Sequence, residues 1–237
     1  MNDALRASIV IPVLDEVFLT RLCLLSLDIA DLGDAEIIVV DNGSTDATPA
    51  LLAEWSAAKP DRIAVRSDEN LGFARGCNLG AARASGDALV FLNNDTFVLP
   101  DWLTSLLRPF ADASVWVTGS RLLYPNGRVQ HAGVVFVEDG PGHAFAGLAG
   151  DLPVVLEERE YQAVTGASLA IRRDVFERFG GFDTAFLNSY EDVDLCLKVR
   201  AAGGRIRYVP TSVAYHWESM SKGRLSANDL RNKELFL

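Results

Sequence analysis

The sequence has little positive charge, few cysteines and no long apolar run. Its 22 lysines and arginines face 32 acidic residues, a formal net charge of −10, and no basic cluster is long enough to follow a phosphate backbone. We therefore expect no nucleic-acid partner. No run approaches the roughly 20 apolar residues of a transmembrane segment, and the N-terminus has no signal-peptide pattern. These absences predict a cytoplasmic protein, and they leave peripheral association with the inner face of the membrane open.

The sequence contains only three cysteines, an odd number. Cys23, Cys77 and Cys196 lie far apart, each within a helix-like pattern. An odd count at such spacing favours buried free thiols over disulfides, metal ligands or redox centres. The chain ends with "RNKELFL", an amphipathic stretch without a cap, so we expect it to be cut inside a helix and to belong to a longer protein.

Two phosphate-binding motifs are also missing. No G-x-G-x-x-G follows the first predicted strand, and G-x-x-x-x-G-K-[ST] occurs nowhere. The sequence therefore argues against a dinucleotide-binding protein and against a P-loop NTPase, because each depends on such a glycine-rich loop. A phosphorylated ligand would have to be held by other means, for which a metal ion on Asp95 and a nearby arginine would serve.

The first half of the chain alternates strands with amphipathic helices. Phe18, Leu22, Leu25 and Ile29, for example, recur at helical spacing. The alternation predicts a mostly parallel sheet with helices on both faces. Residues 120–165 are rich in glycine and predict short strands and long loops. The predicted strands of the first half are 7–14, 36–41, 62–67 and 88–95.

Polar residues stand where three of these strands end. They are Asp15–Glu16, Asp41–Asn42 and Asn93–Asn94–Asp95. In a parallel α/β sheet, ligands bind at the carboxyl ends of the strands, and carboxylates with amides suit a hydrated divalent cation beside a sugar or ribose. Each group alone could be a helix cap or turn. Their coincidence at three strand ends favours a binding site.

Six ordered blocks of the sequence resemble a known family, the family 2 nucleotide-sugar glycosyltransferases of the GT-A fold. Within it, the similarity is greatest to bacterial rhamnosyltransferase-like and surface-polysaccharide transferases. The resemblance implies one α/β domain over 1–237, with a doubly wound, Rossmann-like nucleotide-sugar-binding half (1–115), a smaller acceptor-side half (116–219) and a C-terminal segment (220–237). The blocks are "SIVIPVLDE", "IIVVDNGSTDAT", "NLGFARGCNLGAARASGDALVFLNNDT", "TGASLAIRRDVFERFGGFD", "YEDVDLCLKVRAAG" and "AYHWES".

The resemblance also implies which residues bind the nucleotide and the metal ion. Asn93–Asn94–Asp95 occupies the D-x-D position, where the last acid binds Mn²⁺ or Mg²⁺, and His216 matches a late histidine that helps to hold metal or phosphate. Asn93 stands where an acid is common, which puts strict metal dependence in question. Asp41 matches the acid that recognises a pyrimidine ring, and Arg75 matches a basic residue near the diphosphate. The expected nucleotide-binding residues are Pro12, Val13, Asp41, Arg75 and Asn94.

Asp192 matches the general base that deprotonates the acceptor hydroxyl. In a helix it shares a stripe with Leu195, Cys196 and Val199, which points inward, where desolvation would raise its pKa toward useful basicity. The competing interpretation is that it stabilises a helix N-terminus through the dipole. The weaker candidates for acceptor or diphosphate contacts are Glu191, Trp217 and Lys222.

Together, these expectations describe an enzyme that transfers a sugar from a UDP- or dTDP-linked donor to a hydroxyl of a glycan or lipid-linked glycan, with inversion, in the biosynthesis of cell-surface or cell-wall polysaccharide. Two alternatives stay open. A sugar nucleotidyltransferase would carry a basic, glycine-rich loop after the first strand, and "IPVLDEVF" is neither. A non-catalytic sugar-nucleotide or glycan-binding domain would not need both Asp95 and Asp192.

Overall fold

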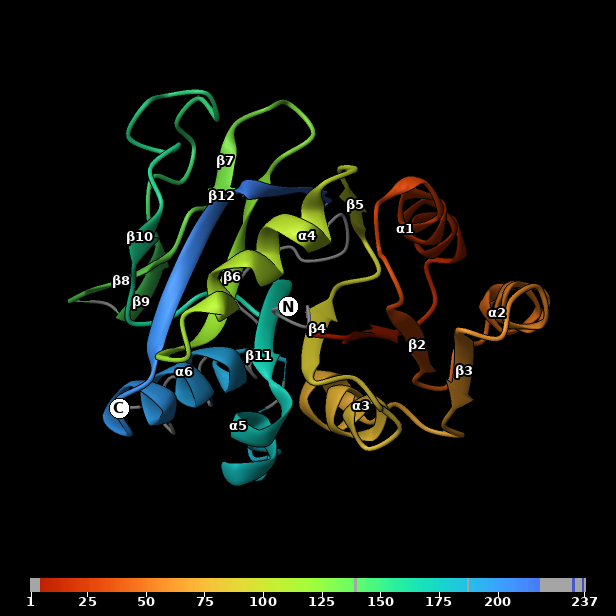
Figure 1. The fold of residues 1–237 in the computed structure, drawn as a ribbon. Helices are drawn as coiled ribbons and strands as arrows, with labels where there is room; N and C mark the ends of the chain where they lie inside the picture. The colour runs from red at the N-terminus through yellow and green to blue at the C-terminus, as the bar shows by residue number, and fades with distance from the viewer. Residues whose placement is uncertain (1–4, 139, 187, 218–231, 233–235, 237) are drawn as a thin grey trace.

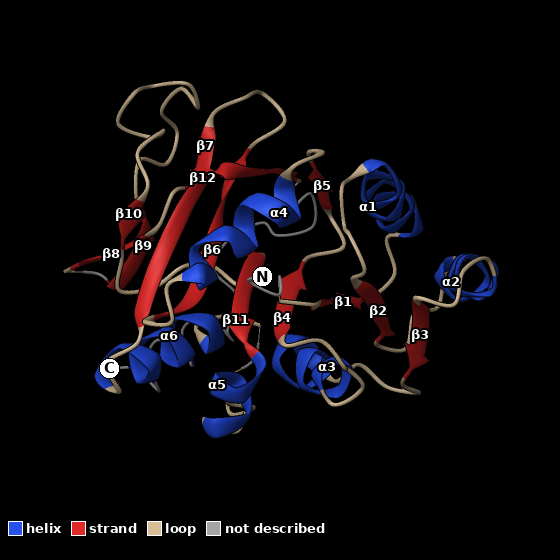
Figure 2. Ribbon diagram, viewed as in Figure 1, coloured by secondary structure: helices blue, strands red, loops and turns tan. Residues whose placement is uncertain are grey.

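The computed structural model describes residues 5–138, 140–186, 188–217, 232 and 236, and shows a large twisted sheet covered by helices on both faces (Figures 1 and 2). The strand order along the sheet is β10-β12-β6-β11-β4-β1-β2-β3. This confirms the predicted α/β architecture. No helix in the described ranges is long and apolar enough to cross a membrane.

The first half forms the parallel part of the sheet, in which β1 pairs with β2 and β4, and β2 pairs with β3. Each of the first three strands is followed by a helix, as the alternation predicts, and the returning crossovers keep the strands parallel. The elements are β1 (Ala7–Val13), α1 (Val17–Ile29), β2 (Glu36–Asp41), α2 (Thr48–Ala57), β3 (Arg62–Arg66), α3 (Gly72–Ala81) and β4 (Ala88–Leu92).

The second half adds antiparallel strands to the same sheet. β11 (Ser168–Arg172) lies antiparallel between β4 and β6 (Val115–Leu123), and β12 (Arg205–His216) runs parallel to β6. β8 (Val134–Val137) and β9 (Gly140–His143) form a separate hairpin. The remaining elements are β5 (Thr96–Val98), α4 (Trp102–Leu107), the 3-10 helix η1 (Arg108–Ala111), β7 (Val129–His131), β10 (Arg159–Glu160), α5 (Arg173–Arg178) and α6 (Glu191–Ala201).

Two apolar cores lie on opposite faces of the sheet. Because side chains alternate along a strand, Ile9 and Ile11 of β1 pack with α1, α2 and α4, whereas Val10 packs with α3, α5 and α6. Helix α3 approaches the sheet closely at Gly80, where an added Cβ would overlap Val10 and lie 3.0 Å from Val40. The Gly/Ala-rich composition of this helix is therefore a packing requirement.

The predictions for the cysteines and for the glycine-rich middle are confirmed. All three cysteines are buried free thiols, and burial raises the pKa of Cys23 and of Cys196 to about 12, despite hydrogen bonds that lower it. Trp102 is fully buried in the core, and its indole N–H donates to the hydroxyls of Ser120 and Ser168. The glycine-rich middle forms short strands and loops, as predicted.

Candidate functional site

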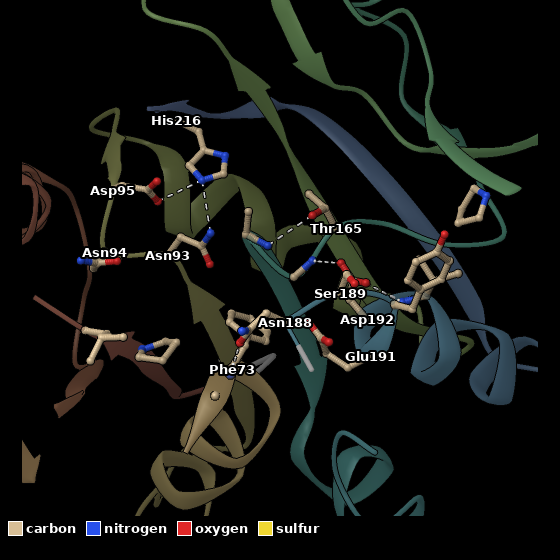
Figure 3. Close-up of a pocket in the computed structure, with 18 of the residues that line it drawn as sticks. Phe73, Asn93, Asn94, Asp95, Thr165, Asn188, Ser189, Glu191, Asp192 and His216 are labelled. Carbon is tan, nitrogen blue, oxygen red and sulfur yellow. Dashed lines mark hydrogen bonds and ion pairs between the residues drawn. The ribbon is translucent and has the colours of Figure 1, made fainter. Parts of the chain in front are cut away.

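A cavity of about 660 Å³ opens at the carboxyl ends of β1, β2 and β4, and its opposite wall comes from the second half of the chain (Figure 3). This is the edge where ligands collect in open α/β sheets. The residues that line it are Pro12, Val13, Leu14, Asn42, Asn70, Gly72, Phe73, Asn93, Asn94, Asp95, Val134, Pro141, Gly142, His143, Thr165, Gly166, Ala167, Asn188, Ser189, Tyr190, Glu191, Asp192, Val193 and His216.

Asp95 and His216 meet on one wall of this cavity. The register of β12 against β5 places His216 opposite Thr96, and the backbone N–H of Trp217 donates to the Asp95 carbonyl at 2.9 Å. The Nε2 atom of His216 then lies 3.0 Å from Asp95 Oδ1 and 3.2 Å from Asn93 Nδ2 (Figure 3). Two residues 121 positions apart in sequence are thus brought together, as the resemblance implies.

The donor set suits a divalent cation. His216 Nδ1 lies 2.7 Å from Gln130 Oε1 and donates to it, so in neutral His216 a lone pair remains on Nε2. That lone pair faces Asp95 Oδ1, a buried atom with no hydrogen-bond partner. Two acceptors held this close are stabilised by a cation between them. Among the described residues no group of three or more His, Cys, Asp or Glu side chains could bind a metal ion, so such an ion would need further ligands from substrate or water.

The nucleotide-side residues separate into two groups. Pro12, Val13 and Asn94 line the cavity, and the Asn94 amide is oriented by donating to Thr20 Oγ1 at 2.9 Å. Arg75, by contrast, lies exposed on α3 and does not line the cavity.

Asp41 lies just behind the cavity wall. Its carboxylate is buried, accepts the Ser44 backbone N–H at 2.8 Å and forms an ion pair with Arg66. Its neighbour Asn42 lines the cavity instead, and Asn42 Oδ1 is a buried acceptor without a hydrogen-bond partner. Because a buried, unpaired acceptor is costly, this amide has the character of a ligand-binding group. The sequence pointed to the pair Asp41–Asn42 but not to which member faces the ligand.

Asp192 lies at the start of α6, on the wall opposite the strand ends (Figure 3). Its Oδ2 accepts the Gly166 N–H at 2.6 Å, and its Oδ1 accepts the Val193 N–H at 2.8 Å. An added Cβ at Gly166 would lie 3.3 Å from the Cβ of Asp192 and from the Phe73 ring, so this close approach depends on the glycine. Both carboxylate oxygens keep a second lone pair for a ligand proton.

The weaker candidates for acceptor or diphosphate contacts differ in whether they line the cavity. Glu191 is buried and lines the cavity. Trp217 is half-buried and does not line it. Lys222 lies outside the described residues. Asp194, which the helical stripe places away from Asp192, forms an ion pair with Lys198 at 2.6 Å.

Several further residues of the second half, which the sequence analysis did not single out, line the cavity. Asn188 accepts the Phe73 N–H at the start of α3 at 2.9 Å, a contact across 115 positions. Thr165 and Gly166 contact His131 and Asp192 through backbone N–H groups, which no side chain in the sequence indicates. His143 lines the cavity, whereas His131 is buried behind it. The sequence left open whether these two histidines were site, loop or surface residues.

Comparison with known proteins identifies the family. Residues 8–180 match the model of glycosyl transferase family 2. The chain is 36% identical over 235 residues to the uncharacterized protein y4gI of Sinorhizobium fredii, covering 94% of this chain and 26% of the relative. It is 37% identical over 195 residues to the O-antigen biosynthesis protein RfbC of Myxococcus xanthus, covering 79% and 15%. The chain thus spans about a quarter or less of these two relatives.

A further relative is matched over most of its length. The N-acetylglucosaminyl-diphospho-decaprenol L-rhamnosyltransferase of Mycobacterium tuberculosis is 27% identical over 236 residues, with 87% of this chain and 74% of that protein covered.

Solved structures share the fold. The mannosyltransferase PcManGT of Pyrobaculum calidifontis, in complex with GDP-Man and Mn²⁺, superposes with a TM-score of 0.72 at 22% identity, covering 93% of this chain and 59% of that one. GalNAc-T7 with UDP, GalNAc and Mn²⁺ gives a TM-score of 0.79 at 20% identity, covering 99% and 48%. With the family match extending over more than half of the sequence, the chain belongs to glycosyl transferase family 2 and has the GT-A fold.

Proposed function

We propose that the protein transfers a sugar from a UDP- or dTDP-linked donor to a hydroxyl of a glycan or lipid-linked glycan, with inversion at the anomeric carbon. The observation that carries this proposal is that Asp192 and the Asp95–His216 pair line one cavity from opposite walls. Inverting transfer needs a base beside the acceptor and charge neutralisation at the leaving diphosphate. The cavity provides candidates for both.

Asp192 is the proposed general base. Its carboxylate is held by the N–H groups of Gly166 and Val193, so its orientation is fixed before substrate binds. It accepts the proton of the acceptor hydroxyl as that oxygen attacks the anomeric carbon, and the diphosphate leaves from the opposite face. Glu191 lies beside it on the same wall and is proposed to contact the acceptor.

Asp95 and His216 are the residues that would hold Mn²⁺ or Mg²⁺, which supplies charge neutralisation for the departing diphosphate. Gln130 fixes the His216 ring by accepting a hydrogen bond from Nδ1, which leaves the lone pair of Nε2 facing Asp95. An amide at position 93 contributes no charge, so Asp95 would be the main anionic ligand. The proposed nucleotide contacts are Pro12, Val13, Asn94 and the pair Asp41–Asn42.

The biological setting is proposed from the relatives. RfbC is named for O-antigen biosynthesis, and the mycobacterial relative for rhamnosyl transfer to a diphospho-decaprenol-linked sugar. We propose an analogous role in the assembly of a cell-surface polysaccharide, in the cytoplasm at the inner face of the membrane, where a lipid-linked acceptor would be available.

A thermal-shift screen tests this proposal. UDP, dTDP and GDP are each added at saturating concentration with Mn²⁺ or with EDTA. A ligand at 100 times its Kd stabilises by about 2.7 kcal/mol, which corresponds to a rise in Tm of about 5–10 °C for a chain of this size. We expect UDP or dTDP to give this shift with Mn²⁺, and the matching sugar nucleotides to be hydrolysed slowly without acceptor. No shift with any nucleotide diphosphate, and no hydrolysis or transfer, would overturn the proposal.

A further inference from the structure

All three histidines of the chain gather at the edge of the cavity. His216 belongs to the proposed metal pair. His131, at the end of β7, is fully buried, and His143, at the end of β9, lines the cavity. The two rings of His131 and His143 pack edge to face, with centroids 4.9 Å apart at 86°. The proposed reaction gives His131 and His143 no role.

The tautomer of His131 follows from its neighbours. Its Nε2 atom lies 3.2 Å from the Gly133 backbone N–H and 3.4 Å from the Thr165 backbone N–H. A backbone N–H can only donate, so Nε2 must carry a lone pair. Burial, with smaller effects from His143 and His216, holds the pKa of His131 well below 6.5. The neutral ring therefore carries its proton on Nδ1.

This tautomer fixes that of His143. The two Nδ1 atoms lie 2.8 Å apart. Since His131 Nδ1 carries a hydrogen, it donates, and His143 Nδ1 must accept. A neutral His143 then carries its proton on Nε2, which makes that nitrogen a hydrogen-bond donor.

His131 also reaches the proposed base through one short backbone segment. Thr165 donates its N–H to His131, the next residue Gly166 donates its N–H to Asp192, and the carbonyl of Ala167 accepts the N–H of Asn93 at 3.0 Å. The segment 165–167 thus contacts the base on one side and the metal-side strand on the other (Figure 3). A shift of Thr165 would move the N–H that orients Asp192.

We propose that His131 is a positioning residue that acts in two directions, and that His143 is a substrate-binding residue. Through Nε2, His131 holds the Thr165–Gly166 backbone that orients Asp192. Through Nδ1, it fixes His143 in the tautomer whose Nε2–H donates to an oxygen of the donor substrate. That oxygen belongs either to the diphosphate or to a hydroxyl of the donor sugar. The proposal rests on the proposed function for its catalytic consequence, but the tautomers themselves do not depend on it.

Nitrogen NMR of the full chain with ¹⁵N-labelled histidine tests the tautomers directly, because three histidines give three assignable ring systems. We expect His131 as the neutral Nδ1–H form and His143 as the neutral Nε2–H form at pH 7.5. His131 in the Nε2–H form, or charged, would overturn the proposal whatever the enzyme's substrate is.

The same sample, titrated with UDP and with UDP-glucose in the presence of Mg²⁺, and in parallel with dTDP and dTDP-glucose, tests the ligand contact. A change at His143 Nε2 with the free nucleotide assigns the contact to the diphosphate. A change with the sugar nucleotide alone assigns it to the sugar. If a ligand raises Tm and His143 does not respond, His143 is not a substrate-binding residue.

Two substitutions of His131 test its two hydrogen bonds separately, the one to Thr165 and the one to His143. In His131→Gln the amide oxygen takes the place of Nε2 and still accepts from Thr165, whereas the donor to His143 is lost. In His131→Asn the amide N–H takes the place of Nδ1, and the acceptor for Thr165 is lost. Since each hydrogen bond contributes about 1 kcal/mol, we expect the Gln variant to raise the donor KM about fivefold at nearly constant kcat, and the Asn variant to lower kcat about fivefold. Equal changes in both variants, in step with lower Tm, would mean that His131 is merely structural.

His143 has its own matched pair. Gln at position 143 keeps an N–H donor near the place of Nε2, and Phe keeps the ring volume without a donor. We expect His143→Phe to weaken donor binding about tenfold and His143→Gln to weaken it less than threefold. The opposite order, or no effect of Phe, would contradict the donor role.

Discussion

Replacement of Asp192 by Asn tests the central chemical assignment. The change removes the proposed base while keeping the size of the side chain. General-base catalysis contributes about 10²–10⁴-fold, equivalent to about 3–5 kcal/mol of transition-state stabilisation. We therefore expect kcat for sugar transfer to fall by that factor. We expect the Kd of the free nucleotide to change less than threefold, because the proposed nucleotide contacts come from the strand ends.

The structure also indicates how much stability the Asp192→Asn variant should lose. The carboxylate accepts two backbone N–H groups, from Gly166 and Val193. Asn offers one acceptor oxygen, so its NH₂ group must face one of these donors. Loss of one such hydrogen bond costs about 1–2 kcal/mol, or about 2–8 °C in Tm. The variant should remain folded at assay temperature, and its Tm measures whether the lost activity is a folding effect.

Asp194→Asn is the matched control. It removes the same charge from the same helical turn, but Asp194 pairs with Lys198 and does not line the cavity. An i,i+4 ion pair contributes about 0.3–0.5 kcal/mol, so Tm should fall by less than about 2 °C, with kcat within twofold of wild type. If Asp192→Asn retained kcat within threefold of this control, Asp192 would be a helix-terminus residue and not the base.

Three further changes test the metal pair, the core and an ionisable strand residue. Asp95→Asn should weaken UDP or dTDP binding with Mn²⁺ at least tenfold, so that it approaches the value with EDTA; wild-type binding that EDTA leaves unchanged would refute the metal site. Gly80→Ala should destabilise by about 1–3 kcal/mol, because the new methyl group overlaps Val10, and unchanged Tm would show that α3 can move away. Burial alone would raise the pKa of Glu36, but hydrogen bonds from Ser8 and Ser85 outweigh it and hold the pKa below 4.5. Its carboxylate therefore stabilises the fold above that pH and loses this effect as pH falls through the folded-state pKa, so the stability difference between wild type and Glu36→Gln, measured by urea unfolding, should shrink below pH 4.5.

The fold was predictable wherever local pattern and tertiary environment agree. Continuous apolar strands followed by helices define β1 to β4, and these pair in parallel as predicted. Helix α1 is more instructive. Its apolar stripe includes Phe18, Leu25 and Ile29, which are 68%, 52% and 65% exposed, whereas Cys23, Leu24 and Leu27 are buried. The periodicity gave the helix correctly, but the buried face was decided by the packing of the sheet.

Cavity-lining residues could be predicted where they directly follow a strand. Asp95 and Asn94 follow β4 directly, so the position of the strand fixes theirs. Arg75 shows the limit, because which side of α3 faces the cavity depends on how Ala74 and Cys77 pack against the sheet. The backbone contacts of Thr165 and Gly166 were not predictable, since a peptide N–H carries no sequence signal.

We expect the two walls of the cavity to determine different parts of substrate specificity. The strand ends of β1, β2 and β4 supply Pro12, Val13, Asn42 and Asn94, which line the cavity and are proposed to contact the nucleotide. The opposite wall takes residues from the β8–β9 hairpin and from the segment 165–167. The β8–β9 hairpin forms a separate sheet, so it can change without disturbing the strands of the large sheet. The proposed base is oriented by this second wall, through Gly166. Exchange of the hairpin residues other than His143 should alter the choice of sugar or acceptor and leave nucleotide binding intact.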